Sequence, residues 1–190
     1  MKSVVILSAG SGARFGADKM NAKLCNGKTV LETSVDKFRN IADEIIIVTR
    51  DTSAISTIFP DCKVTLGGQT RSESVARGLL AVDEKCDIVA IHDGARPFVS
   101  RQLIATIYNE AEQYCSAVPY TVSTDTVIYK DSPIAREEIK LLQTPQAFSY
   151  KKIRALYQTS ASSFTDDSQL YATNYPVHYV LGESSNRKIT

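Results

Sequence analysis

The sequence has little of what a metal centre or a disulfide framework requires. It contains two histidines, and its four cysteines (Cys25, Cys62, Cys86 and Cys115) are widely scattered with no CxxC pair. Reduced thiols, as found in the cytosol, are therefore the better interpretation, although cysteines that are distant in sequence can still pair in space.

Long apolar runs and excess charge are also missing. The longest apolar stretches, such as EIIIVT and DIVAIH, are far too short to span a bilayer, and the N-terminus has no signal-peptide core. The formal net charge of +1 argues against the broad cationic surface that is typical of nucleic-acid binders. We therefore expect a cytoplasmic protein with no membrane or nucleic-acid partner, in which any basic site is local.

What is present is an alternation of strand-like and helix-like segments in a chain of 190 residues. Five apolar, β-branched runs are predicted to be buried strands, at 3–7, 44–49, 63–66, 87–92 and 117–122. Helical periodicity occurs at 29–38, 71–82 and 101–114. The alternation predicts a Rossmann-like α/β fold, with a mostly parallel sheet and helices on both faces.

The pattern changes at about residues 123–146. This stretch looks like two extended segments joined by the turn signal KDSP, which is typical of a protruding β-arm. An arm that buries little against its own domain usually packs on a partner. We therefore expect residues 1–190 to form a single domain with a dimerisation arm, and the protein to be a homodimer.

The first strand leads into a glycine-rich loop, LSAGSGARFGADKM. Its glycines, Gly10, Gly12 and Gly16, have the spacing G-x-G-x-x-x-G, which is neither the dinucleotide fingerprint nor a Walker loop. A long loop that also carries Arg14 and Lys19 favours a polyphosphate ligand. A plain glycine turn with solvated cations is an equally good interpretation of this segment by itself.

Two further clusters follow strands, and ligands of open α/β sheets bind beside the carboxyl ends of the strands. GGQTRSES places Gly68, Arg71 and Ser74 at a helix start, where they suit a phosphate or a pyrimidine edge, although a capped helix start explains this segment more simply. HDGARP presents Asp93 at a strand tip, as α/β enzymes present a carboxylate to Mg²⁺, with Arg96 as an anion clamp. His92 should point away from Asp93 and pack nearby.

Taken together, these segments resemble the 2-C-methyl-D-erythritol 4-phosphate cytidylyltransferases of the non-mevalonate isoprenoid pathway. AGSGARFG, GGQTRSESVARGL, HDGARPF, QTPQAF, TDD and NRKIT occur in the order of that family over essentially the whole chain. HDGARPF and QTPQAF are the most specific of these motifs. The resemblance implies a nucleotidyltransferase-type fold, the substrates CTP and a polyol phosphate, and Mg²⁺ or another divalent cation.

The resemblance also implies roles for individual residues. The catalytic cations are Arg14 and Lys19, and Asp93 supports the metal ion. The implied nucleotide-binding residues are Ala9, Gly10, Ser11, Gly12, Gly68, Arg71, Ser74 and Lys188. The implied acceptor-binding residues are Arg96, Asp125, Thr126, Arg136 and Thr165, of which Arg136 comes from the arm of the second subunit.

The chain departs from the family pattern at two positions, and rival functions stay open. Asn21 stands where the family usually has a lysine, so Lys19 is favoured as the second catalytic cation and Lys23 is the alternative. Gln69 follows the glycine pair where many members have an acid. The rivals are a ribitol-5-phosphate cytidylyltransferase, a nucleotide-binding protein without catalysis and, against the glycine spacing, a nicotinamide-dependent oxidoreductase.

Overall fold

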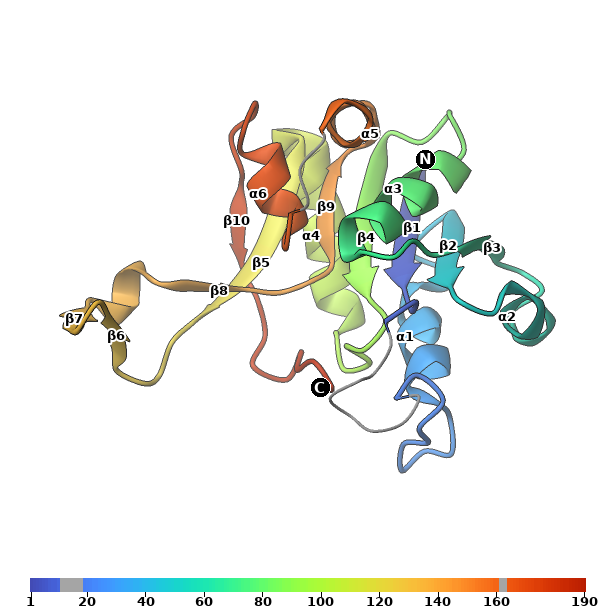
Figure 1. Ribbon diagram of the computed structural model, residues 1–190, viewed down its shortest axis with the longest axis horizontal. Helices are drawn as coiled ribbons and strands as arrows, with labels where there is room; N and C mark the ends of the chain where they lie inside the picture. Colours follow the sequence, from blue (N-terminus) through green and yellow to red (C-terminus); the bar gives the residue numbers. More distant parts are fainter. Residues whose placement is uncertain (11–18, 161–163) are drawn as a thin grey trace.

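The computed structural model describes residues 1–10, 19–160 and 164–190, and one large sheet organises them (Figure 1). The strand order is β10-β5-β9-β4-β1-β2-β3. The bounds are β1 Lys2–Leu7, β2 Glu44–Thr49, β3 Lys63–Leu66, β4 Ile88–Asp93, β5 Ser116–Val122, β9 Gln146–Ser149 and β10 Tyr179–Leu181. The helices are α1 Val30–Phe38, α2 Thr52–Ile58, α3 Arg71–Ala81, α4 Arg101–Tyr114, α5 Tyr150–Thr159 and α6 Asp167–Tyr171.

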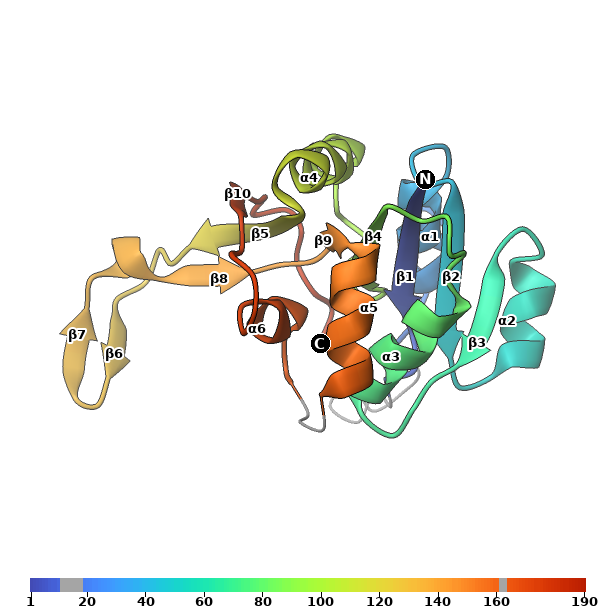
Figure 2. The same cartoon turned by 90° about the horizontal axis from the view of Figure 1, so that it is seen from above.

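The sheet is mostly parallel and is covered on both faces, so the predicted fold class is confirmed. Strands β4, β1, β2 and β3 run parallel to one another, and β10 runs parallel to β5. Figure 2 shows α1 and α4 on one side of the sheet and α3 and α5 on the other. Strand β9, which was not predicted, lies antiparallel between β4 and β5.

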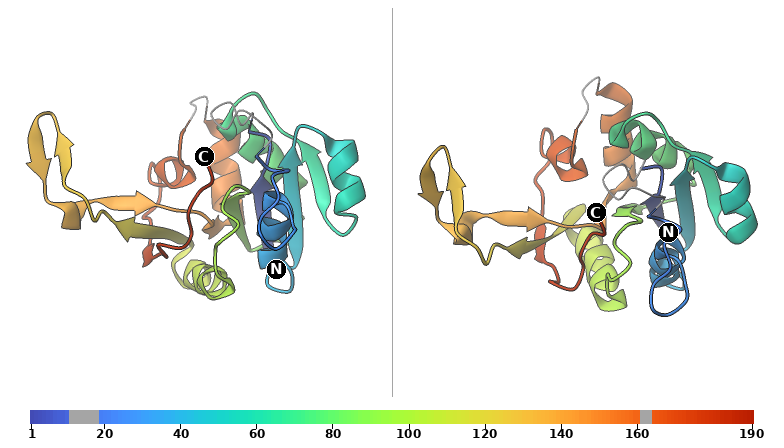
Figure 3. Two further views of the ribbon diagram at one scale, coloured as in Figure 1. Left: turned by 90° about the horizontal axis from the view of Figure 1, so that it is seen from below. Right: turned by 60° about the horizontal axis from the view of Figure 1, so that its bottom comes forward.

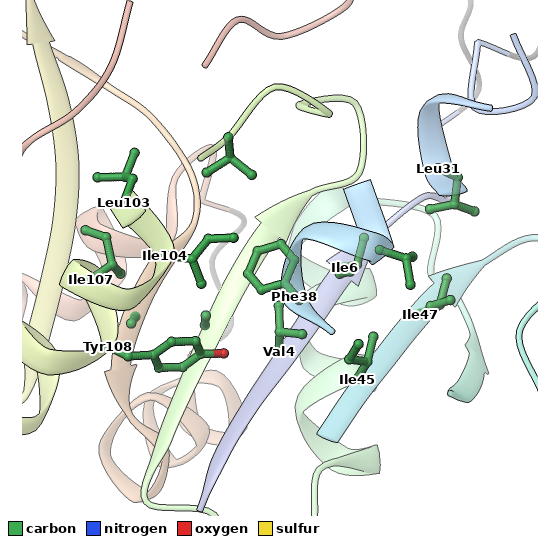
Figure 4. Close-up of a cluster of buried hydrophobic side chains, with 14 of the residues drawn as sticks. Val4, Ile6, Leu31, Phe38, Ile45, Ile47, Leu103, Ile104, Ile107 and Tyr108 are labelled. Atoms are coloured by element: carbon green, nitrogen blue, oxygen red, sulfur yellow. The ribbon is translucent and has the colours of Figure 1, made fainter. Parts of the chain in front are cut away.

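Local sequence explains where the main helices begin and which face they bury. Thr29 and Glu32 form a reciprocal capping box at the start of α1, and Ser100 caps α4. Apolar side chains of these helices pack on alternate residues of β1 and β2, as in the cluster around Phe38 and Tyr108 (Figure 4). The Tyr108 hydroxyl donates a hydrogen bond to the Ser3 carbonyl (2.9 Å), so this buried polar group is satisfied.

Two sequence predictions need correction. Strand β3 is not buried: Lys63 and Leu66 are exposed, because β3 is the edge strand and pairs with β2 alone. The predicted arm ends too late, since Gln143, Thr144 and Gln146 are buried and β9 already belongs to the central sheet. The apolar-run criterion does not distinguish an edge strand from a central one.

The arm itself extends away from the body of the protein (Figure 3). Its tip is the hairpin of β6 Val127–Tyr129 and β7 Ser132–Ile134. Lys130 and Asp131 have positive φ angles in the turn between these strands. A short 3-10 helix, Arg136–Glu138, then leads into β8 Lys140–Leu142, which pairs with β5 and joins the arm to the large sheet.

Close packing of α3 on the sheet gives a direct test of the fold. A Cβ atom on Gly78 would lie 2.4 Å from Val5 Cγ1 and 2.9 Å from Val48 Cγ2. We expect Gly78→Ala to lower the free energy of unfolding by about 1–3 kcal/mol, because overpacking outweighs the better helix propensity of alanine. Urea denaturation should show little change for Leu80→Ala, which alters an exposed position of the same helix, and an unaffected Gly78→Ala protein would contradict this packing.

Candidate active site

A cavity of about 310 Å³ lies at the carboxyl ends of the four parallel strands β4, β1, β2 and β3. It is the kind of place at which open α/β sheets bind ligands. Many of the residues singled out in the sequence line it: Ala9, Gly10, Lys19, Gly68, Arg71, Ser74, Asp93 and Lys188. Segments that are far apart along the chain therefore contribute to one site.

Asp93, at the end of β4, is the acidic centre of this cavity. Lys188 Nζ lies 2.7 Å from Asp93 Oδ2, Arg71 Nε lies 3.7 Å from Oδ1, and Arg96 Nε lies 3.8 Å from Oδ2. Burial by itself would raise the pKa of Asp93, but Lys188 and Arg71 outweigh it and lower the pKa to about 2. The group is thus ionised at neutral pH, and the cations around it leave the site with net positive charge.

The donor set around Asp93 fits one kind of metal ion only. In the parts of the chain that the structure describes, no three His, Cys, Asp or Glu side chains gather closely enough to hold a metal. Asp93 is the single carboxylate among the described residues of the cavity wall. Mg²⁺ is often held by one or two carboxylates together with substrate phosphates and waters. The site therefore fits a divalent ion bound mainly by a phosphorylated ligand and does not fit a resident metal centre.

Arg71 is held in place by an acid that the sequence analysis did not identify. Arg71 Nη1 and Nη2 donate to the two carboxylate oxygens of Asp167 at 2.9 and 2.6 Å. The Tyr157 hydroxyl also donates to Asp167 (2.6 Å), which is fully buried. Burial would lower the pKa of Arg71, but the Asp167 carboxylate raises it overall, so the guanidinium stays charged. The signal in the sequence was the second aspartate of TDD.

Packing within the protein already requires glycine at both positions of the pair after β3. A Cβ atom on Gly67 would lie 2.4 Å from Ala9 Cβ, and one on Gly68 would lie 2.2 Å from Glu73 Cβ. Ser74 Oγ accepts from the Gly68 N–H (3.1 Å) and donates to the Thr70 carbonyl (2.9 Å). Glycine is required here by protein packing, and Ser74 fixes the backbone of the loop.

His92 lies behind the site and is fully buried. Its Nε2 is 3.2 Å from the Arg96 carbonyl, and its Nδ1 is 3.3 Å from Thr144 Oγ1, which also accepts from the Asp93 N–H (3.0 Å). The ring packs against Phe38. As expected, this histidine supports the backbone of the HDGARP segment and does not face the cavity.

Burial of His92 predicts a pH dependence of stability. Burial lowers the pKa of His92 from 6.5 to about 4, so the unfolded chain binds more protons between these values. Stability is therefore lost as the pH falls from 6.5 to 4, by about 3 kcal/mol, whereas Asp93 contributes only at lower pH. Urea denaturation between pH 7 and 4 should show a flatter profile for His92→Gln, and parallel profiles would contradict this assignment.

The segment of Lys188 and Ile189 lies against the cavity, and Lys188 lines it. Lys19 Nζ donates to the Ile189 carbonyl (3.1 Å), and the Ile189 N–H donates to the Ala95 carbonyl (2.8 Å). Lys188 lies beside them on Asp93. Lys23, the alternative to Lys19, is exposed and does not line the cavity.

Other predicted site residues lie elsewhere. Arg96 is mostly buried, and its Nη1 donates to the Asn186 carbonyl (2.8 Å) beside the cavity. Four are exposed residues that do not line the cavity: Asp125, Thr126 and Arg136 in the arm, and Thr165 before α6. Ser11, Gly12 and Arg14 lie outside the described residues. Arg50 also lines the cavity but was not predicted. It directly follows the predicted strand at 44–49, and that position could have identified it.

The cations at the carboxyl ends of these strands surround Asp93, the one carboxylate among the described residues of the cavity wall, and suit a polyphosphate. This is the arrangement expected of an α/β nucleotidyltransferase. Residues 2–190 match the family described as IspD: 2-C-methyl-D-erythritol 4-phosphate cytidylyltransferase, and the chain belongs to this family.

Individual relatives agree with this assignment. The 2-C-methyl-D-erythritol 4-phosphate cytidylyltransferase of Thermus thermophilus is 34% identical over 99% of this chain and 91% of its own length. A crystal structure of 4-diphosphocytidyl-2C-methyl-D-erythritol synthase from Anaerococcus prevotii superposes with a TM-score of 0.87 at 35% identity, covering 100% of this chain and 90% of that one. The bifunctional IspDF of Campylobacter jejuni has a TM-score of 0.89 at 26% identity, and the match covers 100% of this chain and 52% of that chain.

Proposed function

We propose that this protein transfers a cytidylyl group from CTP to 2-C-methyl-D-erythritol 4-phosphate. The products are 4-diphosphocytidyl-2-C-methyl-D-erythritol and pyrophosphate, and the step belongs to isoprenoid-precursor biosynthesis. The observation that carries the proposal is that the family match spans residues 2–190 and that residues of four of its motifs, among them Gly10, Arg71, Asp93 and Lys188, line one cavity.

The reaction needs positioning and charge neutralisation more than a base. An oxygen of the acceptor phosphate attacks the α-phosphorus of CTP in line, and the bond to the bridging oxygen breaks, so that pyrophosphate leaves with the electron pair. A phosphate monoester is already nucleophilic near neutral pH. Lys19 and Lys188 would neutralise the triphosphate and the charge that develops during transfer, together with Arg14.

The other predicted residues divide between the two substrates and the metal ion. We assign the nucleotide to the loops that carry Gly10 and Gly68, with Ala9, Ser11, Gly12, Arg71 and Ser74. Asp93 would hold Mg²⁺ or another divalent cation against the phosphates, where the ion supplies further neutralisation of negative charge. The acceptor is assigned to Arg96 and Thr165, and to Asp125, Thr126 and Arg136 of the arm.

We propose that residues 1–190 form a single domain and that the protein is a homodimer. The exposed apolar side chains of the arm support the dimer. Val122, Ile128, Tyr129 and Leu141 are large apolar side chains that are about half exposed or more along the arm, and burying them against a second copy would stabilise a dimer. Sedimentation velocity should give a dimer for the wild type and a monomer for the double substitution Ile128→Glu and Tyr129→Glu. A wild type that is monomeric at micromolar concentration would refute this arrangement.

We propose that the protein resides in the cytoplasm. All four cysteines are unpaired, which fits a reducing compartment such as the cytoplasm. Among the residues described, no helix is long and apolar enough to cross a membrane.

Pyrophosphate release tests the function directly. Purified protein is mixed with CTP, Mg²⁺ and either 2-C-methyl-D-erythritol 4-phosphate or ribitol 5-phosphate. Turnover with the first acceptor and little with the second is expected. Preference for ribitol 5-phosphate would move the protein to the rival cytidylyltransferase, and CTP binding without pyrophosphate release from either mixture would leave a nucleotide-binding protein.

A further inference from the structure

Arg50 differs from the other cations of the cavity wall. Lys19 Nζ donates to the Ile189 carbonyl, Arg71 is paired with Asp167, and Lys188 is paired with Asp93. Arg50 lines the same cavity and is exposed, and it makes no hydrogen bond or ion pair with any part of the chain that is described. Its donors are therefore available to a ligand.

The sheet places Arg50 away from the acidic centre of the site. Strands β4, β1 and β2 are consecutive neighbours, and adjacent strands are about 4.8 Å apart. Arg50, after β2, is thus about 10 Å from the end of β4 that carries Asp93. The Gly67 N–H donates to the Thr49 carbonyl (2.7 Å), which joins Arg50 to the loop that carries Gly68 and Gln69.

The cavity therefore has two ends of different character. Around Asp93, several cations suit phosphate groups and the transfer step. At the β2 and β3 end, the wall consists of the Gly68–Thr70 loop and the Arg50 side chain. A nucleotide whose α-phosphate reacts near Asp93 extends its ribose and base toward this second end, since the two ends are about one nucleoside apart.

We infer that Arg50 binds the pyrimidine edge of the nucleotide and selects cytosine over uracil. The inference rests on the proposed function. A guanidinium only donates hydrogen bonds, and cytosine offers two adjacent acceptors, O2 and N3. Uracil offers O2, but its N3 carries a proton that would face the guanidinium donors. The Gln69 carboxamide, on the same wall, has an oxygen that can accept from the cytosine amino group.

Binding measurements on CTP and UTP separate a contact to the base from a contact to the phosphates. Dissociation constants are determined calorimetrically with Mg²⁺ and no acceptor, for the wild type, Arg50→Gln and Arg50→Lys. Arg50→Gln should weaken CTP binding by about 10- to 100-fold and UTP binding much less, because the charged donor contributes mainly to cytosine. Arg50→Lys should recover part of the CTP affinity.

The controls make each outcome decisive. Arg154→Gln removes an arginine that is paired with exposed Glu84 and lies outside the site, so its CTP to UTP ratio should equal that of the wild type. If Arg50→Gln weakens CTP and UTP binding equally, Arg50 contacts the triphosphate and the inference is overturned. Unchanged affinities for both nucleotides, in a variant with a wild-type circular dichroism spectrum, would also overturn it. Because no acceptor is present, failure of the transfer assay would overturn the proposed function separately.

Discussion

Replacing Lys19 by alanine is expected to lower kcat by about 10²- to 10³-fold. The ammonium group lines the cavity at the end that contains Asp93, where it can meet charge that builds up on the phosphates during transfer. Loss of one such preorganised donor typically has an effect of this size. The effect should fall mainly on kcat, because the interaction strengthens in the transition state.

Lys23→Ala is the matched control for this experiment. Lys23 is the other lysine that the family pattern allows, and its side chain is exposed and lies outside the cavity. We expect turnover within about two-fold of the wild type, since a solvated cation contributes little to catalysis. If Lys23→Ala loses most of its kcat while Lys19→Ala stays active, then Lys23 is the second catalytic cation and Lys19 is not.

Asp167→Ala is expected to lower the free energy of unfolding by about 3–5 kcal/mol, which is the usual cost of leaving one partner of a buried ion pair uncompensated. Arg71 would lose both of its hydrogen bonds to the Asp167 carboxylate, while the cations Lys188 and Arg96, which share Asp93 with it, would still repel it. The change should therefore also displace the Arg71 side chain from the cavity wall. Chemical denaturation measures the first effect, and KM for CTP measures the second.

Two comparisons separate this pair from an ordinary surface pair. Glu84→Ala removes an acid that also binds an arginine at 2.9 Å but is 82% exposed, and it should cost about 1 kcal/mol or less. The double substitution Arg71→Met and Asp167→Leu should be more stable than Asp167→Ala, because no unpaired charge is left buried. If Asp167→Ala lowers the free energy of unfolding no more than Glu84→Ala does, then solvent reaches the Arg71–Asp167 pair.

The local elements were predictable because each has a signal within its own residues. β-branched runs predicted β1, β2 and β4 to within about one residue, and helical periodicity at 29–38 predicted α1. The short elements α6 and β10 carry too few residues for a period to emerge. Strand β9 was missed because it has only four residues, Gln146–Ser149, and the first of them was assigned to the arm.

Within the site, the residue types and their order along the chain were determined by the sequence itself. Glycines and cations that directly follow apolar parallel strands lie at the same end of the sheet, because the carboxyl ends of parallel strands do. The pairing was decided only by the tertiary structure: Lys188 reaches Asp93, Asp167 holds Arg71, and Arg50 has no partner among the residues that the structure describes. Such pairs join residues that are distant along the chain, so their distances and burial, and with them the charge of the site, exist only once the chain has folded.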